Sequence, residues 1–114
     1  MIINKSTLDQ NFKVYDKEVV AEIIDIFFDE YPERIANLEK AINEEDFDSL
    51  KTVAHGIKGI IANFHAEEPR ELAKQLEHKG ADKDISDTPA ILEKLKDKTE
   101  QMMEELKQIK KEYQ

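Results

Sequence analysis

The last quarter of the chain carries a row of mostly apolar residues separated alternately by three and four positions. This spacing places them on one side of an α-helix, which completes a turn about every 3.6 residues. The row comprises Leu92, Leu95, Thr99, Met102, Leu106, Ile109 and Tyr113. It could form a coiled-coil seam with another chain, but a place in the core of the chain's own helical bundle is the favoured interpretation.

Four shorter runs with helical spacing precede this row. The first extends over residues 20–31, with Asp16 as its expected N-cap, and the second extends over residues 35–42. Between them, Pro32 is expected to break or kink the helix, or to open the second one, because proline has no backbone N–H.

The third run covers residues 50–64, and either Asp46 or Asp48 is expected to cap it. The fourth run covers residues 72–76. It is followed by Gly80, which stands where a helix commonly ends in a left-handed residue, so Gly80 is predicted to adopt that conformation.

The segment Ala81–Asp87 is predicted to be the main loop of the chain. After it, Thr88 is the expected N-cap of the last helix and Pro89 fits the first helical position. These elements predict an all-α fold, an antiparallel four-helix bundle with a short or kinked additional N-terminal helix. With 114 residues, the chain is predicted to form one domain over residues 1–114.

Composition excludes several classes of function. The chain has no cysteine, so disulfides, thiolate metal sites and cysteine nucleophiles are ruled out. Its formal net charge of -9 argues against binding to nucleic acid or to anionic membrane surfaces, both of which attract basic proteins. The first ten residues contain no long apolar run, so a cytoplasmic protein is expected.

The stretch AHGIKG, residues 54–59, places two of the three glycines of the chain inside a helical pattern. Each such glycine costs roughly 1 kcal/mol of helix stability relative to alanine, so the presence of two glycines in one helix calls for an explanation. Helical spacing directs His55 away from the core, beside a set of small and basic residues: Lys51, Lys58, Gly59 and Ala62. An ordinary exposed histidine with tolerated glycines is the plain alternative.

The chemistry available to His55 is narrow. It has no carboxylate or imidazole partner three or four positions along the helix, as a zinc pair would need. No serine lies in a nucleophile-elbow context, and no glycine-rich loop precedes a helix to hold phosphate. A neutral imidazole can still accept a phosphoryl group on a ring nitrogen. Lys58 would favour the neutral ring and balance phosphoryl charge, and bare Gly59 would admit a second protein.

Residues 54–77, AHGIKGIIANFHAEEPRELAKQLE, resemble the signature of histidine phosphotransfer (HPt) domains of two-component phosphorelays. The matching residues are Ala54, His55, Ile57, Lys58, Gly59, Asn63, Ala66, Ala73, Leu76 and Glu77. Residues 27–50 also resemble the family's acidic, aromatic-led helix pair. Two residues depart from the signature, His65 in place of glycine and Pro69 in place of leucine. They bear on the turn before the fourth helix, where Pro69 fits only a first helical turn.

The resemblance implies that His55 is the phosphoacceptor, that Lys58 stabilises the phosphoryl charge, and that Gly59 leaves clearance for the partner. It implies a carrier without turnover of its own, hence no enzyme and no cofactor, with Mg²⁺ supplied by the partner. The implied partners are receiver domains of response regulators and of hybrid sensor histidine kinases, docking around Lys51, Gly56 and Ala62 on a monomer. The alternative is a helical module that binds receivers or kinases without accepting phosphate. His65 and His78 are expected to be structural or surface residues.

Overall fold

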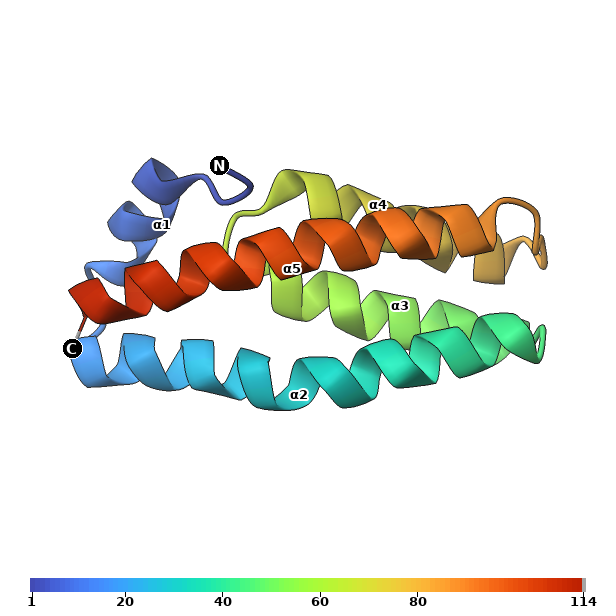
Figure 1. Cartoon of the computed structure of the whole chain (residues 1–114), viewed down its shortest axis with the longest axis horizontal. Coiled ribbons are helices and arrows are strands. Elements are labelled where there is room, and N and C mark those ends of the chain that lie inside the picture. Colours follow the sequence, from blue (N-terminus) through green and yellow to red (C-terminus); the bar gives the residue numbers. More distant parts are fainter. Residues whose placement is uncertain (114) are drawn as a thin grey trace.

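The computed structural model describes residues 1–113, in which five α-helices are the only regular elements. They are α1 (Lys5–Phe12), α2 (Lys17–Asn43), α3 (Phe47–Ala62), α4 (Glu67–Ala81) and α5 (Thr88–Glu112). The predicted all-α class is therefore confirmed. Figure 1 shows α2 and α5 as the two long helices, with the short helix α1 beside the C-terminal end of α5. α1 has no counterpart among the periodic runs of the sequence.

Helix α2 runs without interruption through Pro32, so the break at Pro32 and the new helix beginning there, two of the three expected outcomes, are wrong. Proline inside a helix removes one backbone hydrogen bond and typically costs about 3 kcal/mol. The apolar face of α2 keeps its register on both sides of Pro32, which itself is exposed. The buried residues of this face are Val20, Ile24, Phe27, Tyr31, Leu38, Ala41 and Ile42. Packing of this face against the core offsets the cost of the proline.

The mostly apolar row of α5 faces the inside of the chain, as predicted. Its members from Leu92 to Ile109 are all buried, and α5 packs against both α2 and α4. Thr99, the polar member of the row, is fully buried, and its hydroxyl donates to the Leu95 carbonyl O at 2.8 Å. It also accepts a hydrogen bond from the buried hydroxyl of Tyr31. A row covered in this way has no free surface for a coiled-coil partner.

The loop between α4 and α5 corrects two predictions. Gly80 lies inside α4 with a helical backbone, and the left-handed residue is Lys83, at φ 53°. The N-cap of α5 is Asp87, at φ 64°, whereas Thr88 is the first helical residue and donates to the Ile85 carbonyl O at 2.7 Å. Pro89 occupies the first turn, as expected.

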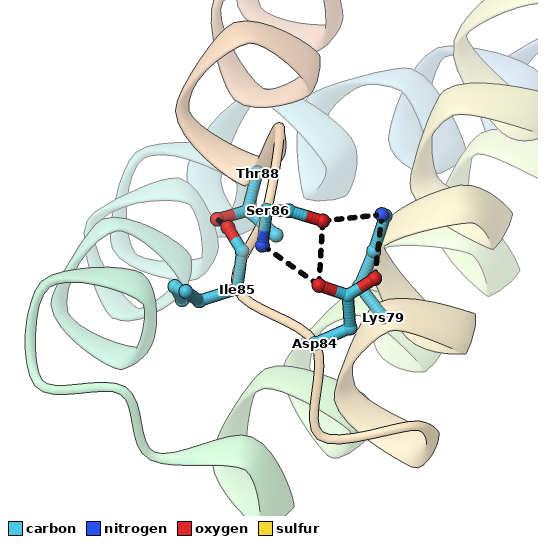
Figure 2. Close-up of polar contacts among 5 residues, drawn as sticks. All are labelled: Lys79, Asp84, Ile85, Ser86 and Thr88. Atoms are coloured by element: carbon cyan, nitrogen blue, oxygen red, sulfur yellow. Dashed lines mark hydrogen bonds and ion pairs between the residues drawn. The ribbon is translucent and has the colours of Figure 1, made fainter.

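Polar contacts hold this loop closed, as Figure 2 shows. The Asp84 carboxylate accepts hydrogen bonds from the Ser86 backbone N–H at 2.9 Å and from the Lys79 Nζ at 3.0 Å. It also accepts one from the Ser86 hydroxyl. These donors, first of all the Ser86 hydroxyl, lower the pKa of Asp84 to about 2. Lys83 thus takes the left-handed position that glycine usually fills after a helix, with the Asp84 backbone N–H donating to the Lys79 carbonyl O, and the side-chain hydrogen bonds hold the loop that follows.

The remaining helix ends follow the sequence closely. Asp16 and Asp46 are the N-cap residues of α2 and α3, and the Asp46 side chain accepts from the Ser49 backbone N–H at 3.2 Å. His65 adopts a left-handed backbone at φ 55°, and Pro69 lies in the first turn of α4. None of the helices within residues 1–113 combines the length and the apolar character needed to cross a membrane.

Candidate functional site

Helix α3 directs His55 outward, as its position in the sequence predicts. The side chain of His55 is 68% exposed, whereas Ala54, Ile57 and Ile61 on the other side of α3 are fully buried. The buried side fixes the rotation of α3 about its axis, because a turned helix would expose these apolar side chains. His55 is thereby held at the surface on a rigid element.

Glu77 of α4 joins His55 and Lys58. Its Oε2 lies 2.6 Å from the His55 Nδ1, and its Oε1 accepts from the Lys58 Nζ at 2.6 Å. Only 14% of the Glu77 side chain is exposed, compared with 23% for Lys58. We refer to these three residues as the His55 cluster. A single carboxylate thus binds two side chains of α3.

The contact with Glu77 decides which nitrogen of the neutral His55 ring carries the proton. The hydrogen bond from Lys58, followed by that from His55, holds the pKa of Glu77 below its ordinary value, against the opposing effect of burial. An ionised carboxylate can only accept hydrogen bonds, so the Nδ1 of His55 must carry the proton. In the neutral ring, Nε2 then presents a lone pair to solvent.

Gly80 sets the distance between α3 and α4. A Cβ atom at Gly80 would lie 2.6 Å from the Lys51 backbone N and 2.9 Å from the Phe47 carbonyl O. Such distances are far inside van der Waals contact, so only glycine permits this approach. The small residues Ala54 and Ala73 are fully buried in the same two helices. Close packing brings Glu77, one turn before Gly80, within reach of α3.

Gly59 and Gly56 have different surroundings on the outer side of α3. A Cβ atom at Gly59 would meet nothing within 4 Å, so the surface one turn after His55 is bare. A Cβ atom at Gly56 would lie 2.7 Å from the Nη1 of Arg34, which belongs to α2. Of the predicted docking residues, Lys51 and Ala62 are exposed and Gly56 is partly covered.

A hollow next to Ala62 is a feature that the sequence did not reveal. It is formed by the end of α1, the start of α2 and the end of α3. Its lining residues are Asn11, Phe12, Val14, Tyr15, Ile23, Ala62, Asn63 and His65. Val14 is 81% exposed and Tyr15 is 50% exposed, which is high for large apolar side chains. We call this surface the α1–α2 hollow.

The two other histidines contribute no side chain to the His55 cluster. His65 holds α1 in place, because its carbonyl O accepts from the Asn4 backbone N–H at 3.0 Å and its Nε2 lies 2.7 Å from the Asn11 Nδ2. His78 is an exposed residue of α4. Within residues 1–113, no three His, Asp or Glu side chains are arranged to hold a metal ion.

Comparison with known proteins identifies the family. A family model described as the Hpt domain matches residues 22–109. The chain is also similar to the crystal structure of histidine-containing phosphotransfer protein B (HptB) from Pseudomonas aeruginosa PAO1. The two chains are 22% identical in sequence and superpose with a TM-score of 0.90, over 98% of this chain and 96% of that chain. This similarity shows that they share a fold. No sequence among curated proteins matches significantly. Because the family model covers most of the chain and the whole His55 cluster, the chain belongs to the Hpt domain family.

Proposed function

We propose that the chain carries phosphoryl groups in a two-component phosphorelay, with His55 as the phosphoacceptor. His55 would receive the group from the aspartyl phosphate of a receiver domain, or from a kinase, and pass it to another receiver. The observation that carries this proposal is the His55 cluster, in which an exposed imidazole has its Nδ1 proton bound by Glu77 and its Nε2 free.

The transfer is an in-line exchange of one bond for another. The Nε2 lone pair of His55 attacks the phosphorus atom and forms a P–N bond. The P–O bond to the receiver's aspartate breaks, and its electron pair leaves with the aspartate as a carboxylate. The imidazole keeps its Nδ1 proton and becomes cationic, a charge that the Glu77 carboxylate stabilises. The reverse steps deliver the group to the next receiver.

The other residues of the site supply charge and space. Lys58, held beside His55 through Glu77, provides positive charge for the phosphoryl oxygens. The bare surface at Gly59 lets the receiver bring its reacting aspartate against the ring. We expect Mg²⁺ and most of the catalytic groups to belong to the receiver, so that the chain acts as a carrier and has no turnover alone.

The receiver is proposed to dock over the outer side of α3, on Lys51, Gly56 and Ala62. The α1–α2 hollow adjoins Ala62 and offers exposed apolar surface for the same contact. We also infer that α2 to α5 make up the antiparallel four-helix bundle, with α1 as the additional N-terminal helix. Each of the four contacts two of the others, which suits a monomeric carrier.

The test compares three proteins: the wild type, His55→Gln and His78→Gln. Receiver domains charged with acetyl phosphate are the donors, and acid-labile phosphate on the chain is measured. We expect His78→Gln to behave as wild type and His55→Gln to take up no phosphate while melting at the same temperature. Uptake by His55→Gln would refute the site. Receiver binding without phosphate uptake by any of the three proteins would favour the alternative, a docking module that accepts no phosphate.

A further inference from the structure

Arg34 lies across the contact between α2 and α3, at the level of the reactive histidine. Its guanidinium occupies the place that a side chain at position 56 would take, because a Cβ there would lie 2.7 Å from Nη1. Residue 56 directly follows His55 in α3. The charged end of Arg34 is therefore held against α3 next to the phosphoacceptor.

The space at Gly56 serves a charged group rather than the packing of two helix backbones. At Gly80 the missing side chain makes room for the backbone of Lys51, which cannot move aside. At Gly56 it makes room for the end of a flexible side chain, which folding alone does not require to lie there. Gly56 thus leaves room for the guanidinium, which lies where a side chain at this position would begin.

Arg34 has unused hydrogen-bonding capacity. Within residues 1–113 its one ion pair is with Glu30, at the long distance of 3.4 Å, and 36% of its side chain is exposed. A guanidinium has five N–H donors in a planar fork that matches a carboxylate. Most of these donors are available to a group that approaches from outside.

The surroundings of His55 indicate which group that is. His55 bonds to Glu77 on α4 through Nδ1, so Nε2 points away from Glu77 and outward. Arg34 reaches α3 from the opposite side, from α2. In the proposed function Lys58 and the Mg²⁺ of the receiver balance the charge of the phosphoryl oxygens, so Arg34 is left to face the surface of the protein that delivers the group.

We propose that Arg34, seated over Gly56, binds a carboxylate on the docked receiver domain and so helps to select which receivers the chain serves. This inference rests on the proposed phosphocarrier function. It adds a residue of α2 to the docking surface and assigns Gly56 the role of leaving room for that residue.

The experiment uses the full chain and a panel of receiver domains charged with acetyl phosphate. Arg34→Met keeps an unbranched, flexible side chain and removes its charge, whereas Arg34→Lys keeps a charge. We expect Arg34→Met to bind its preferred receiver about tenfold more weakly, with a smaller dependence on salt concentration, and Arg34→Lys to lose less. Labelling of His55 by phosphoramidate, a small donor that needs no docking, should stay within about twofold of wild type.

Gly56→Ala supplies a second, independent variant. Its methyl group would displace the guanidinium, so it should weaken receiver binding in the wild-type background and have no further effect in the Arg34→Met background. Unchanged affinity and salt dependence in Arg34→Met would overturn the proposal. An equal loss of phosphoramidate labelling would also overturn it, since Arg34 would then act on the phosphoryl group. Failure of the wild type to accept phosphate from any donor would instead refute the phosphocarrier function.

Discussion

Gly59 and Gly80 both lie within helices, but the absence of a side chain has a different consequence at each position. Gly80 is buried, and the backbone of α3 fills the space beside it. Gly59 is exposed, and nothing lies within 4 Å of where its Cβ would be. The first glycine lets two helices of the same chain approach, and the second leaves room for a molecule that is not part of the chain. Stability and access can therefore be separated by substitution.

The largest effect is expected from a substitution on the exposed side. Gly59→Gln should slow phosphotransfer from a charged receiver about 100-fold, because its side chain would cover the space beside His55 and misplace the reacting groups. The melting temperature should rise slightly, since glutamine has the higher helix propensity. Transfer at the wild-type rate, or loss of activity through unfolding, would contradict the view of Gly59 as a clearance residue.

A smaller effect is expected on the buried side. Gly80→Ala should lower the free energy of unfolding by about 2 kcal/mol, because overpacking typically costs more than the gain in helix propensity. Urea denaturation measures this change, and Gly59→Ala is the matched control. That control should raise the free energy of unfolding by up to about 1 kcal/mol. If the two alanine variants shifted stability in the same direction, the two glycines would not differ as the structure indicates.

The smallest effect is expected at Glu77, which lies in the same helix as Gly80 and bonds to His55 in the helix of Gly59. Glu77→Gln should slow phosphotransfer about tenfold, because the amide no longer enforces the Nδ1 proton of His55. The ¹⁵N chemical shifts of the ring should then move toward the Nε2-protonated form. An unchanged tautomer would show that Glu77 does not position the ring.

The same variant should alter the acid range of stability. The folded pKa of Glu77 lies below its ordinary value of 4.5, so its contribution is fully present above that pH. The contribution is lost as the pH falls through the lowered pKa. Urea midpoints measured between neutral pH and about pH 3 should therefore fall less steeply in Glu77→Gln than in the wild type.

Features that depend on one helix were predictable from the sequence. The buried row of α5 and the outward register of His55, Lys58 and Gly59 follow from helical spacing alone. The Asp46 cap follows from the preference of helix N-termini for a side-chain acceptor. In each case the residues that decide the outcome lie within a few turns of one another.

Features that depend on two helices were not predictable in this way. Glu77 lies 22 positions from His55, and only the packing of α4 on α3 brings them together. Gly80 was predicted to end a helix because glycine is common at helix ends. The approach of the α3 backbone, which explains the glycine, is a tertiary contact that the sequence does not show. Pro32 was predicted to break the helix because proline removes one backbone hydrogen bond. The burial of the α2 face outweighs this loss, and that burial depends on the other helices and not on the local sequence. The residue type was informative in all three cases, but the reason for it lay on another element.

Helix α1 differs from the other helices in how it is held. It has only eight residues, too few for a stable isolated helix, and the match to the family model begins downstream of it. Its attachment depends on buried Leu8 and Phe12, on the His65 carbonyl, and on Glu105, which accepts from the backbone N–H groups of Ile2 and Ile3. Such a segment can open while the rest stays folded, so its amide protons are expected to exchange with solvent at a rate set by local undocking. Because the end of α1 forms one wall of the α1–α2 hollow, undocking of α1 would change the shape of that hollow.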